Sequence, residues 1–348
     1  MSKINIRSPY FINLATTNLT SAKLEIDIYT GVANTSWQSS PQYTLNSTAV
    51  SAKVNFEISE LVKDYIQTEF DGSFPSTPVA ITEATTIFVD YRVTETLITP
   101  QTPVDVLGER AFYGYGYFED GANPVLDNFV LQSNTRILKN TNATVTIPVD
   151  NTIATSLVWK YQGSPVSSIS ISAQTKIENQ ITYVTNTGNF NVDQAEISTG
   201  AKSITINIDS YEKCKYSPIK LTFINKFGAY QEIWMFANSI LSMATNEERY
   251  KSNILTNGTY NTYDPQIKLL TKNANQTLKL NSDYYPESYN EVFRQLFLSE
   301  KVWIDYEGQT LGVNIESKQI TYKTSLTDSL INYTIDVSFA FDTINNIR

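Results

Sequence analysis

The stretch INYTIDVSFAFD, residues 331–342, decides the fold class, because its side chains alternate between apolar and polar. A period of two residues places successive side chains on opposite faces of a β-strand. We therefore predict an antiparallel strand with one face buried and the other in water. The apolar positions are Tyr333, Ile335, Val337, Phe339 and Phe341, and the polar positions are Asn332, Thr334, Asp336, Ser338 and Asp342.

A helix is predicted shortly before this strand, in residues 288–299. Ser288, followed three residues later by Glu291, matches the capping box that begins many helices. The apolar residues of the segment recur at the spacing of one helix face, which would pack on a sheet. They are Val292, Phe293, Leu296 and Phe297.

Short strands surround the predicted helix. Residues 302–306 and 311–315 alternate in the same way as the last strand, and polar strands are expected around 266–280. One helix laid against an antiparallel sheet defines an α+β module. We assign this module to residues 246–348.

The first part of the chain, residues 1–145, is predicted to form a β-sandwich-like module. Its strands are separated by turn-forming residues, and Ser59 begins one short helix. A long loop or hairpin extension is expected over 94–145, which holds Pro100, Pro103 and many glycine and tyrosine residues. The expected strands lie at 24–29, 54–58 and 87–93.

A second β-sandwich-like module is predicted for residues 146–245. Trp159 is expected to be the core tryptophan of an immunoglobulin-like sandwich, although no cysteine pair accompanies it. The fold class is therefore mainly β, with two sandwich modules followed by the α+β module. The strands expected in the second module lie at 145–149, 157–161, 166–171, 180–185, 204–208 and 219–225.

The composition excludes several kinds of chemistry. The 348 residues include no histidine and one cysteine, Cys214, so neither a Ser/His or Cys/His catalytic pair nor a His-containing metal site can be built. The net charge of −9 argues against binding to a phosphate backbone, which requires a basic surface. We expect Cys214 to be a free thiol and the chain to bind no cofactor.

The length exceeds what one hydrophobic core usually supports, so two or three domains are expected. The first residues contain no apolar signal core, and no stretch approaches the ~20 apolar residues of a membrane span. We therefore expect synthesis in the cytoplasm and no membrane span.

The run Phe112-Tyr-Gly-Tyr-Gly-Tyr-Phe118 is the most distinctive local feature of the chain. Stacked aromatic rings on a loop could bind sugars or pack against a neighbouring subunit. Alternatively, they could fill one side of a hairpin, since aromatic residues are common in sheets. We favour the hairpin or subunit packing. The candidate subunit-interface residues are Tyr113, Tyr115, Tyr117, Phe118 and Arg294, the last on the outer side of the predicted helix.

Acid/base chemistry would need two carboxylates in one cleft. The neighbouring pairs in the sequence are Glu119 with Asp120, Glu247 with Glu248, and Asp305 with Glu307. Most such groups are solvated surface residues, so we expect no enzymatic activity and no catalytic residues. A glycosidase that uses two carboxylates is the enzyme class that stays open.

Ligand-binding motifs are weak. Asp120 and Asn123 could contribute to a calcium site, but the spacing of a calcium-binding loop is missing. No glycine-rich loop is followed by the lysine of a nucleotide-binding motif. We predict no metal site.

Several blocks resemble structural proteins of tailed bacteriophages and prophages of Bacteroidota, with the crAss-like phages as the nearest group. The last hundred residues also resemble the tail-tube and tail-hub fold. The blocks are IRSPYFINL (6–14), LEIDIYTG (24–31), GYGYFEDGANP (114–124), NKFGAYQEIWMF (225–236), YNEVFRQLFLSEKVWIDYEG (289–308) and INYTIDVSFAF (331–341).

The resemblance implies a virion protein that forms a closed ring in the tail or neck, with the genomic DNA passing through it. Its partners would be identical copies in a six- or twelve-fold cyclic homo-oligomer, together with neighbouring tail, portal or hub proteins. An acidic lumen would let DNA slide past without binding. The alternative is an adhesin of the tail tip that binds a carbohydrate or a receptor through the tyrosine run.

Overall fold

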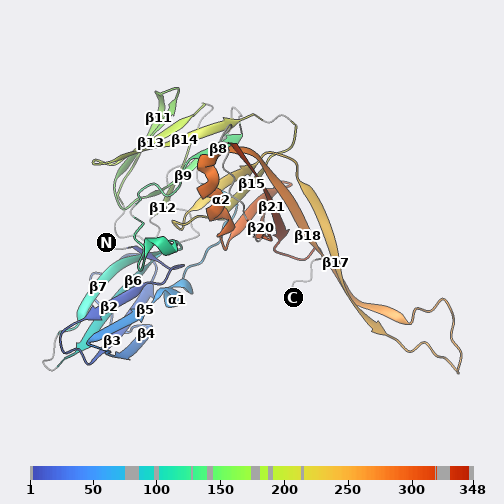
Figure 1. Cartoon of the computed structure of the whole chain (residues 1–348), viewed down its shortest axis with the longest axis horizontal. Helices are drawn as coiled ribbons and strands as arrows, with labels where there is room; N and C mark the ends of the chain where they lie inside the picture. The colour runs from blue at the N-terminus through green and yellow to red at the C-terminus, as the bar shows by residue number, and fades with distance from the viewer. Residues whose placement is uncertain are drawn as a thin grey trace. The chain divides into compact units, whose positions relative to one another are not determined.

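The chain is mainly β, as predicted, and its strands form several sheets (Figure 1). Its α-helices, α1 (Ser59–Lys63) and α2 (Asn290–Phe297), are short. Among the residues described, no helix is both long and apolar enough to cross a membrane. The computed structural model describes residues 3–74, 86–97, 102–126, 128–138, 144–173, 181–186, 191–212, 215–317, 319 and 330–344.

The chain divides into two compact units, and each is described by itself. Unit 1 consists of Met1–Glu212, Thr222–Ile233 and Glu291–Ser299. Unit 2 consists of Lys213–Leu221, Trp234–Asn290 and Glu300–Arg348.

The N-terminal strands of unit 1 form a five-stranded sheet with the order β1-β7-β6-β3-β4. The alternation predicted for residues 24–29, in β3, is confirmed, because Leu24, Ile26 and Ile28 are all buried. A separate two-stranded sheet joins β2 (Phe11–Ala15) to β5 (Lys53–Glu57). The five strands are β1 (Lys3–Asn5), β3 (Ser21–Tyr29), β4 (Tyr43–Thr48), β6 (Thr86–Thr96) and β7 (Val104–Phe112).

Seven further strands of unit 1 form two sheets, β11-β10-β13-β14-β8 and β12-β9. The six strands predicted between 145 and 225 are all found, with small changes at their ends. The seven strands are β8 (Thr135–Leu138), β9 (Thr146–Asp150), β10 (Thr155–Tyr161), β11 (Ser164–Ile171), β12 (Ile181–Thr185), β13 (Gln194–Ser198) and β14 (Ser203–Tyr211).

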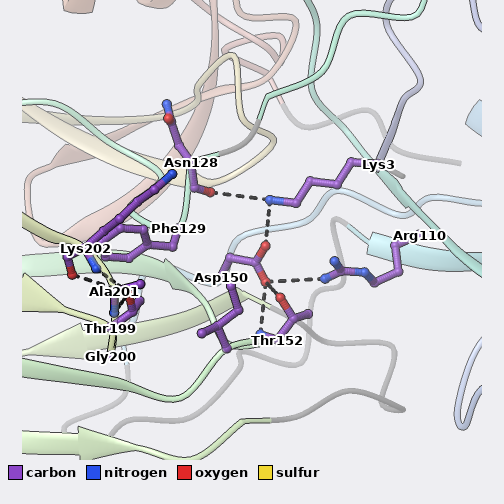
Figure 2. A pocket seen from close by; sticks show the side chains of 11 residues that line it. Lys3, Arg110, Asn128, Phe129, Asp150, Thr152, Thr199, Gly200, Ala201 and Lys202 are labelled. Atoms are coloured by element: carbon purple, nitrogen blue, oxygen red, sulfur yellow. Dashed lines mark hydrogen bonds and ion pairs between the residues drawn. The ribbon is translucent and has the colours of Figure 1, made fainter. Parts of the chain in front are cut away.

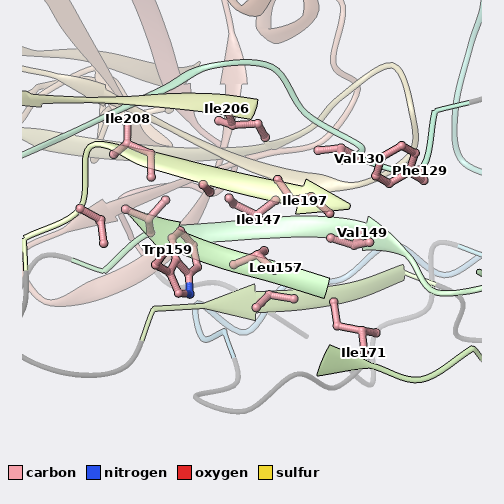
Figure 3. Packing of buried hydrophobic residues seen from close by; sticks show 14 of the residues in the cluster. Phe129, Val130, Ile147, Val149, Leu157, Trp159, Ile171, Ile197, Ile206 and Ile208 are labelled. Carbon is pink, nitrogen blue, oxygen red and sulfur yellow. The ribbon is translucent and has the colours of Figure 1, made fainter. Parts of the chain in front are cut away.

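These two sheets share one hydrophobic core (Figure 3). Trp159 on β10 is completely buried there, as predicted, between side chains of both sheets. Ile147 and Val149 come from β9, while Ile197 comes from β13. Burying a side chain of this size contributes about 2–3 kcal/mol, so Trp159 is a principal stabilising residue of this core.

The interval 94–145, predicted to be a long loop or hairpin extension, contains strands that are members of two sheets, and only the pairing of β6 with β7 corresponds to a hairpin. Strand β7 lies between β1 and β6 inside the N-terminal sheet, and β8 is a member of the second five-stranded sheet. Strand β7 is stabilised by hydrogen bonds to neighbours on both sides, which local sequence cannot reveal.

The last strands belong to a seven-stranded sheet with the order β16-β15-β19-β20-β21-β18-β17. The alternation predicted for β21 is confirmed from Ile331 to Phe339. Phe341 lies beyond the strand, and 48% of its surface is exposed. The strands are β15 (Ile219–Ile224), β16 (Tyr230–Met235), β17 (Ile240–Lys251), β18 (Ile267–Pro286), β19 (Val302–Tyr306), β20 (Gln309–Ile315) and β21 (Leu330–Phe339).

Helix α2 is found where a helix was predicted, and Val292, Phe293 and Leu296 are buried. The predicted capping box is wrong. Residues 287–289 form a separate 3₁₀ turn, and the Glu291 carboxylate accepts hydrogen bonds from the Tyr117 hydroxyl and from the Gln295 side-chain amide, one turn further along α2.

Candidate functional site

The tyrosine run leaves β7 and packs backbone to backbone against the turn between β15 and β16. The Tyr115 amide donates a hydrogen bond to the Lys226 carbonyl at 2.9 Å. A Cβ atom on Gly114 would lie 2.7 Å from that same oxygen, and one on Gly228 would lie 2.9 Å from the Tyr113 nitrogen. Gly228 also has a φ of +78°, which favours glycine. The run is therefore a fixed segment of unit 1.

Burial separates the candidate interface residues into two groups. Tyr113 and Tyr115 are 5% and 7% exposed, whereas Phe118 is 99% exposed. Burial raises the pKa of the Tyr115 hydroxyl to about 12. A sugar stacks on an open ring face, so the two buried tyrosines offer it little surface, and Phe118 is the residue of the run that a partner can reach.

Tyr117 and Arg294 are brought into direct contact. The Arg294 guanidinium carbon lies 3.6 Å from the centre of the Tyr117 ring, a cation–π arrangement. The Tyr117 hydroxyl donates to Glu291 Oε1 at 2.7 Å, and Lys226 Nζ lies 3.6 Å from the same oxygen. Burial, together with the hydrogen bond to the Glu291 carboxylate, raises the pKa of Tyr117.

Arg7, from the N-terminal segment, also contacts the residues around Tyr117. Its guanidinium carbon lies 4.7 Å from the Tyr115 ring centre, and its Nη2 atom donates to the Leu298 carbonyl at 2.6 Å. The group joins the N-terminal segment, the tyrosine run and α2 within unit 1. We call it the Tyr117 cluster, and it consists of Arg7, Tyr115, Tyr117, Lys226, Glu291 and Arg294.

The candidate acid/base pair Glu247 and Glu248 is not brought together. The two residues are neighbours on β17, so their side chains point to opposite faces of the strand. Glu247 forms ion pairs with Arg249 and with Lys272, the latter at 3.8 Å.

Two of the other candidate carboxylates, Asp305 and Asp120, bind nearby groups. Asp305 forms an ion pair with Lys220 at 3.0 Å and accepts a hydrogen bond from the Thr310 hydroxyl at 3.1 Å. Asp120 Oδ2 accepts the Tyr117 amide at 2.7 Å, which fixes the turn η1 (Phe118–Asp120). Asp305 therefore stabilises its strand, and Asp120 stabilises the turn in which it lies.

The candidate calcium ligands are also engaged. The Asn123 side chain accepts the Phe11 amide and donates to the Phe11 carbonyl, both at 2.7 Å. Asp120 holds its own turn, as described above. In the part of the chain that the structure describes, no cluster of three acidic or sulfur ligands could hold a metal ion.

A surface that the sequence did not predict is formed by β17 and the first half of β18. We call residues 240–276 the arm. Strand β18 pairs with β21 from Thr277 onward, while its earlier residues pair with β17. All 12 residues of β17 are exposed. Figure 1 shows this two-stranded ribbon continuing beyond the other strands of its sheet.

The two faces of the arm differ in chemistry. Leu241 lies opposite Leu278, which is buried in the sheet, so we name this side the inner face. Leu241, Met243 and Leu269 on the inner face are 46%, 61% and 51% exposed. On the opposite, outer face the residues are mostly polar. They are Ile240, Ser242, Ala244, Asn246, Glu248, Tyr250, Lys268, Thr271, Asn273 and Asn275, of which Ile240, Ala244 and Tyr250 are the exceptions to the polar character.

A buried ion group lines a cavity of about 670 Å³ in unit 1 (Figure 2). Asp150 at the end of β9 accepts Lys3 Nζ at 2.6 Å and Arg110 Nη1 at 3.3 Å. The Thr152 hydroxyl and amide also donate to it, at 2.8 and 3.1 Å. Burial acts to raise the pKa of Asp150, but Lys3 and Arg110 outweigh it and hold this pKa below its ordinary value.

The cavity therefore contains an ion clasp, formed by Lys3, Arg110 and Asp150. Lys3 Nζ also lies 3.4 Å from the Asn128 carbonyl. The clasp connects β1 and β7 of the first sheet to β9 of the second group of sheets. We interpret these contacts as a structural connection between the two groups of sheets.

No protein-family model, curated protein or solved structure matches this chain.

Proposed function

We propose that this chain is a non-enzymatic structural protein of a phage virion, which forms a closed ring of identical copies in the tail or neck. The arm is the observation that supports the proposal. A two-stranded ribbon is at best marginally stable alone in water, and this one also exposes apolar side chains on its inner face. Such a ribbon is stabilised when a partner covers it.

A ring of identical copies satisfies this requirement with one repeated contact. In a head-to-tail contact, two different surfaces of the same chain meet, and a suitable rotation closes the series into a ring. Closure also removes open strand edges, which otherwise favour aggregation. Six- or twelve-fold symmetry, with tail, portal or hub proteins above and below, fits the sequence resemblance to structural proteins of tailed phages.

We also propose a fold for each module and a negative charge for the lumen of the ring. The two groups of sheets in unit 1 would be immunoglobulin-like sandwiches, and the last part of the chain would be a tail-tube-like module. The net charge of −9 favours a lumen wall that repels DNA, so the genome would pass without binding. The adhesin alternative has less support, because Tyr113 and Tyr115 are buried.

The test is the assembly state of the purified full chain at high protein concentration. Native mass spectrometry and negative-stain images should show a single closed ring of defined copy number. A variant in which residues 244–273 are replaced by Asn-Gly should remain folded by circular dichroism but stay monomeric. Monomers of the parent chain, both alone and with its neighbouring virion proteins, would refute the proposed function.

A further inference from the structure

Both long edges of the arm lack a strand partner in the part of the chain that the structure describes. Strand β17 ends the seven-stranded sheet, so its outer edge is open along its whole length. On β18, pairing with β21 begins at Thr277. The C-terminal segment continues alongside it to Asn273, whose side chain accepts the Ile344 amide at 3.0 Å and donates to Asp342 at 3.0 Å. Among the described residues, no strand pairs with the other edge of residues 267–272.

The two open edges fit each other in direction. Strands β17 and β18 are antiparallel within the arm. If β17 of one copy lies beside β18 of the next, the alternation of strand direction continues from copy to copy. A closed ring of such arms has every backbone edge of this region paired. The natural occupant of either edge is therefore the opposite edge of a second copy.

Charge supports the same pairing. Glu248 lies on the open β17 edge and Lys268 on the β18 edge, both on the outer face of the arm. Neither residue has an ion-pair partner among the described residues, whereas on the inner face Glu247 pairs with both Arg249 and Lys272. Two exposed charges of opposite sign on complementary edges would pair across a contact between copies.

The balance of charge in the chain is compatible with this contact. The arm contains four basic and three acidic residues, while the rest of the chain contains 22 basic and 32 acidic residues. Neighbouring arms therefore approach with little net repulsion, unlike other surfaces of this acidic chain.

We propose that β17 of one copy pairs in antiparallel fashion with residues 267–272 of the next copy, with Glu248 beside Lys268. This inference rests on the proposed ring and names the surface that closes it. It predicts a continuous wall of arms, in which each copy contributes two strands.

Charge reversal tests the pairing. Glu248→Lys places two lysines at each contact, and Lys268→Glu places two acidic residues there. We expect each variant to raise the concentration needed for half-assembly about tenfold, because an exposed attraction is replaced by repulsion. The double variant should assemble like the parent. Lys53→Glu, an exposed reversal on β5, is the matched control and should assemble normally.

Mixing the two single variants provides a sharper result. An alternating ring of Glu248→Lys and Lys268→Glu copies places a lysine opposite a glutamate at every contact. An equimolar mixture should therefore form rings at concentrations where neither variant does so alone. Native mass spectrometry of isotopically labelled copies should show equal numbers of each in the ring.

Disulfide trapping gives an independent measurement. In a Cys214→Ser chain, Glu248→Cys combined with Lys268→Cys should produce a ladder of covalent oligomers under oxidation, and either substitution alone should not go beyond dimers. If the parent forms rings, but the charge reversals do not weaken assembly and oxidation gives no ladder, this pairing is wrong and the proposed function still stands. Failure of the parent chain to form rings would overturn both.

Discussion

Replacing Asp150 with asparagine should strongly destabilise unit 1. The carboxylate lies between Lys3 and Arg110, whose side chains are 11% and 6% exposed, and asparagine keeps its size but not its charge. Two buried cations would then lose the negative charge of Asp150. Breaking a buried ion group in this way costs about 3–5 kcal/mol, which corresponds to a fall in Tm of roughly 10 °C.

Urea and thermal unfolding, followed by tryptophan fluorescence, would measure this loss. Asp105→Asn is the matched control, since Asp105 also contacts an arginine, Arg92, at 2.6 Å, but both side chains are about one-third exposed. Because water screens that ion pair, Asp105→Asn should unfold at the same urea concentration and the same temperature as the parent chain.

The pH dependence has a defined sign. Lys3 and Arg110 hold the pKa of Asp150 below its ordinary value, so its stabilising effect is complete above about pH 4 and is lost as the pH falls through the folded-state pKa. Asp150→Asn should remove this acid-labile component. If Asp150→Asn and Asp105→Asn shift the unfolding midpoint equally at pH 7, the clasp does not stabilise the unit as we reason.

Three further substitutions test the packing of unit 1. Trp159→Ala should cost about 3–5 kcal/mol in urea unfolding, because it leaves a large cavity between two sheets. Gly228→Ala should cost about 1–3 kcal/mol, since the residue has a positive φ and a Cβ atom there would meet backbone atoms of the tyrosine run. Gly121→Ala is its control, because Gly121 also has a positive φ but has open space around it. The difference between the two variants measures the cost of the steric clash apart from the backbone strain. Arg294→Gln removes the cation above Tyr117 and should lower the Tm by a few degrees; an unchanged Tm would show that the contact contributes little.

Sequence periodicity predicted the buried elements well. The alternation in β21 and the helical spacing in α2 each correspond to buried side chains, because burial on one face is what creates such a pattern. Trp159 was placed in the core for a different reason, by analogy with the core tryptophan of immunoglobulin-like sandwiches, and it is buried.

Only half of the arm was predicted. Polar strands were expected around 266–280, where β18 is found, but β17 was not expected, since it has no buried face to produce a pattern. Strand β17 contains the run Met243-Ala-Thr-Asn-Glu-Glu-Arg249, rich in residues that favour helices, and all its side chains are exposed. It is a strand because β18 pairs with it, a contact that local sequence does not encode.

The environment of the tyrosine run depends on tertiary structure. From the sequence we favoured aromatic residues that fill one side of a hairpin or pack against a neighbouring subunit. In the structure, Gly114 of the run and Gly228 of the turn between β15 and β16, which lie far apart in the sequence, permit a close approach of two backbones. Arg294 was placed on the outer side of a helix, and its contact with Tyr117 depends on tertiary structure.

The parallel pairing of β1 with β7 has a consequence for biosynthesis. Residues 3–5 find their strand partner only when residues 110–112 have been made, and Lys3 finds Asp150 later still. At typical rates of translation this leaves the start of the chain waiting on the order of ten seconds. A nascent chain stalled before Asp150 emerges from the ribosome would therefore be cut readily by proteases near its first residues, and one stalled well after that point would resist them.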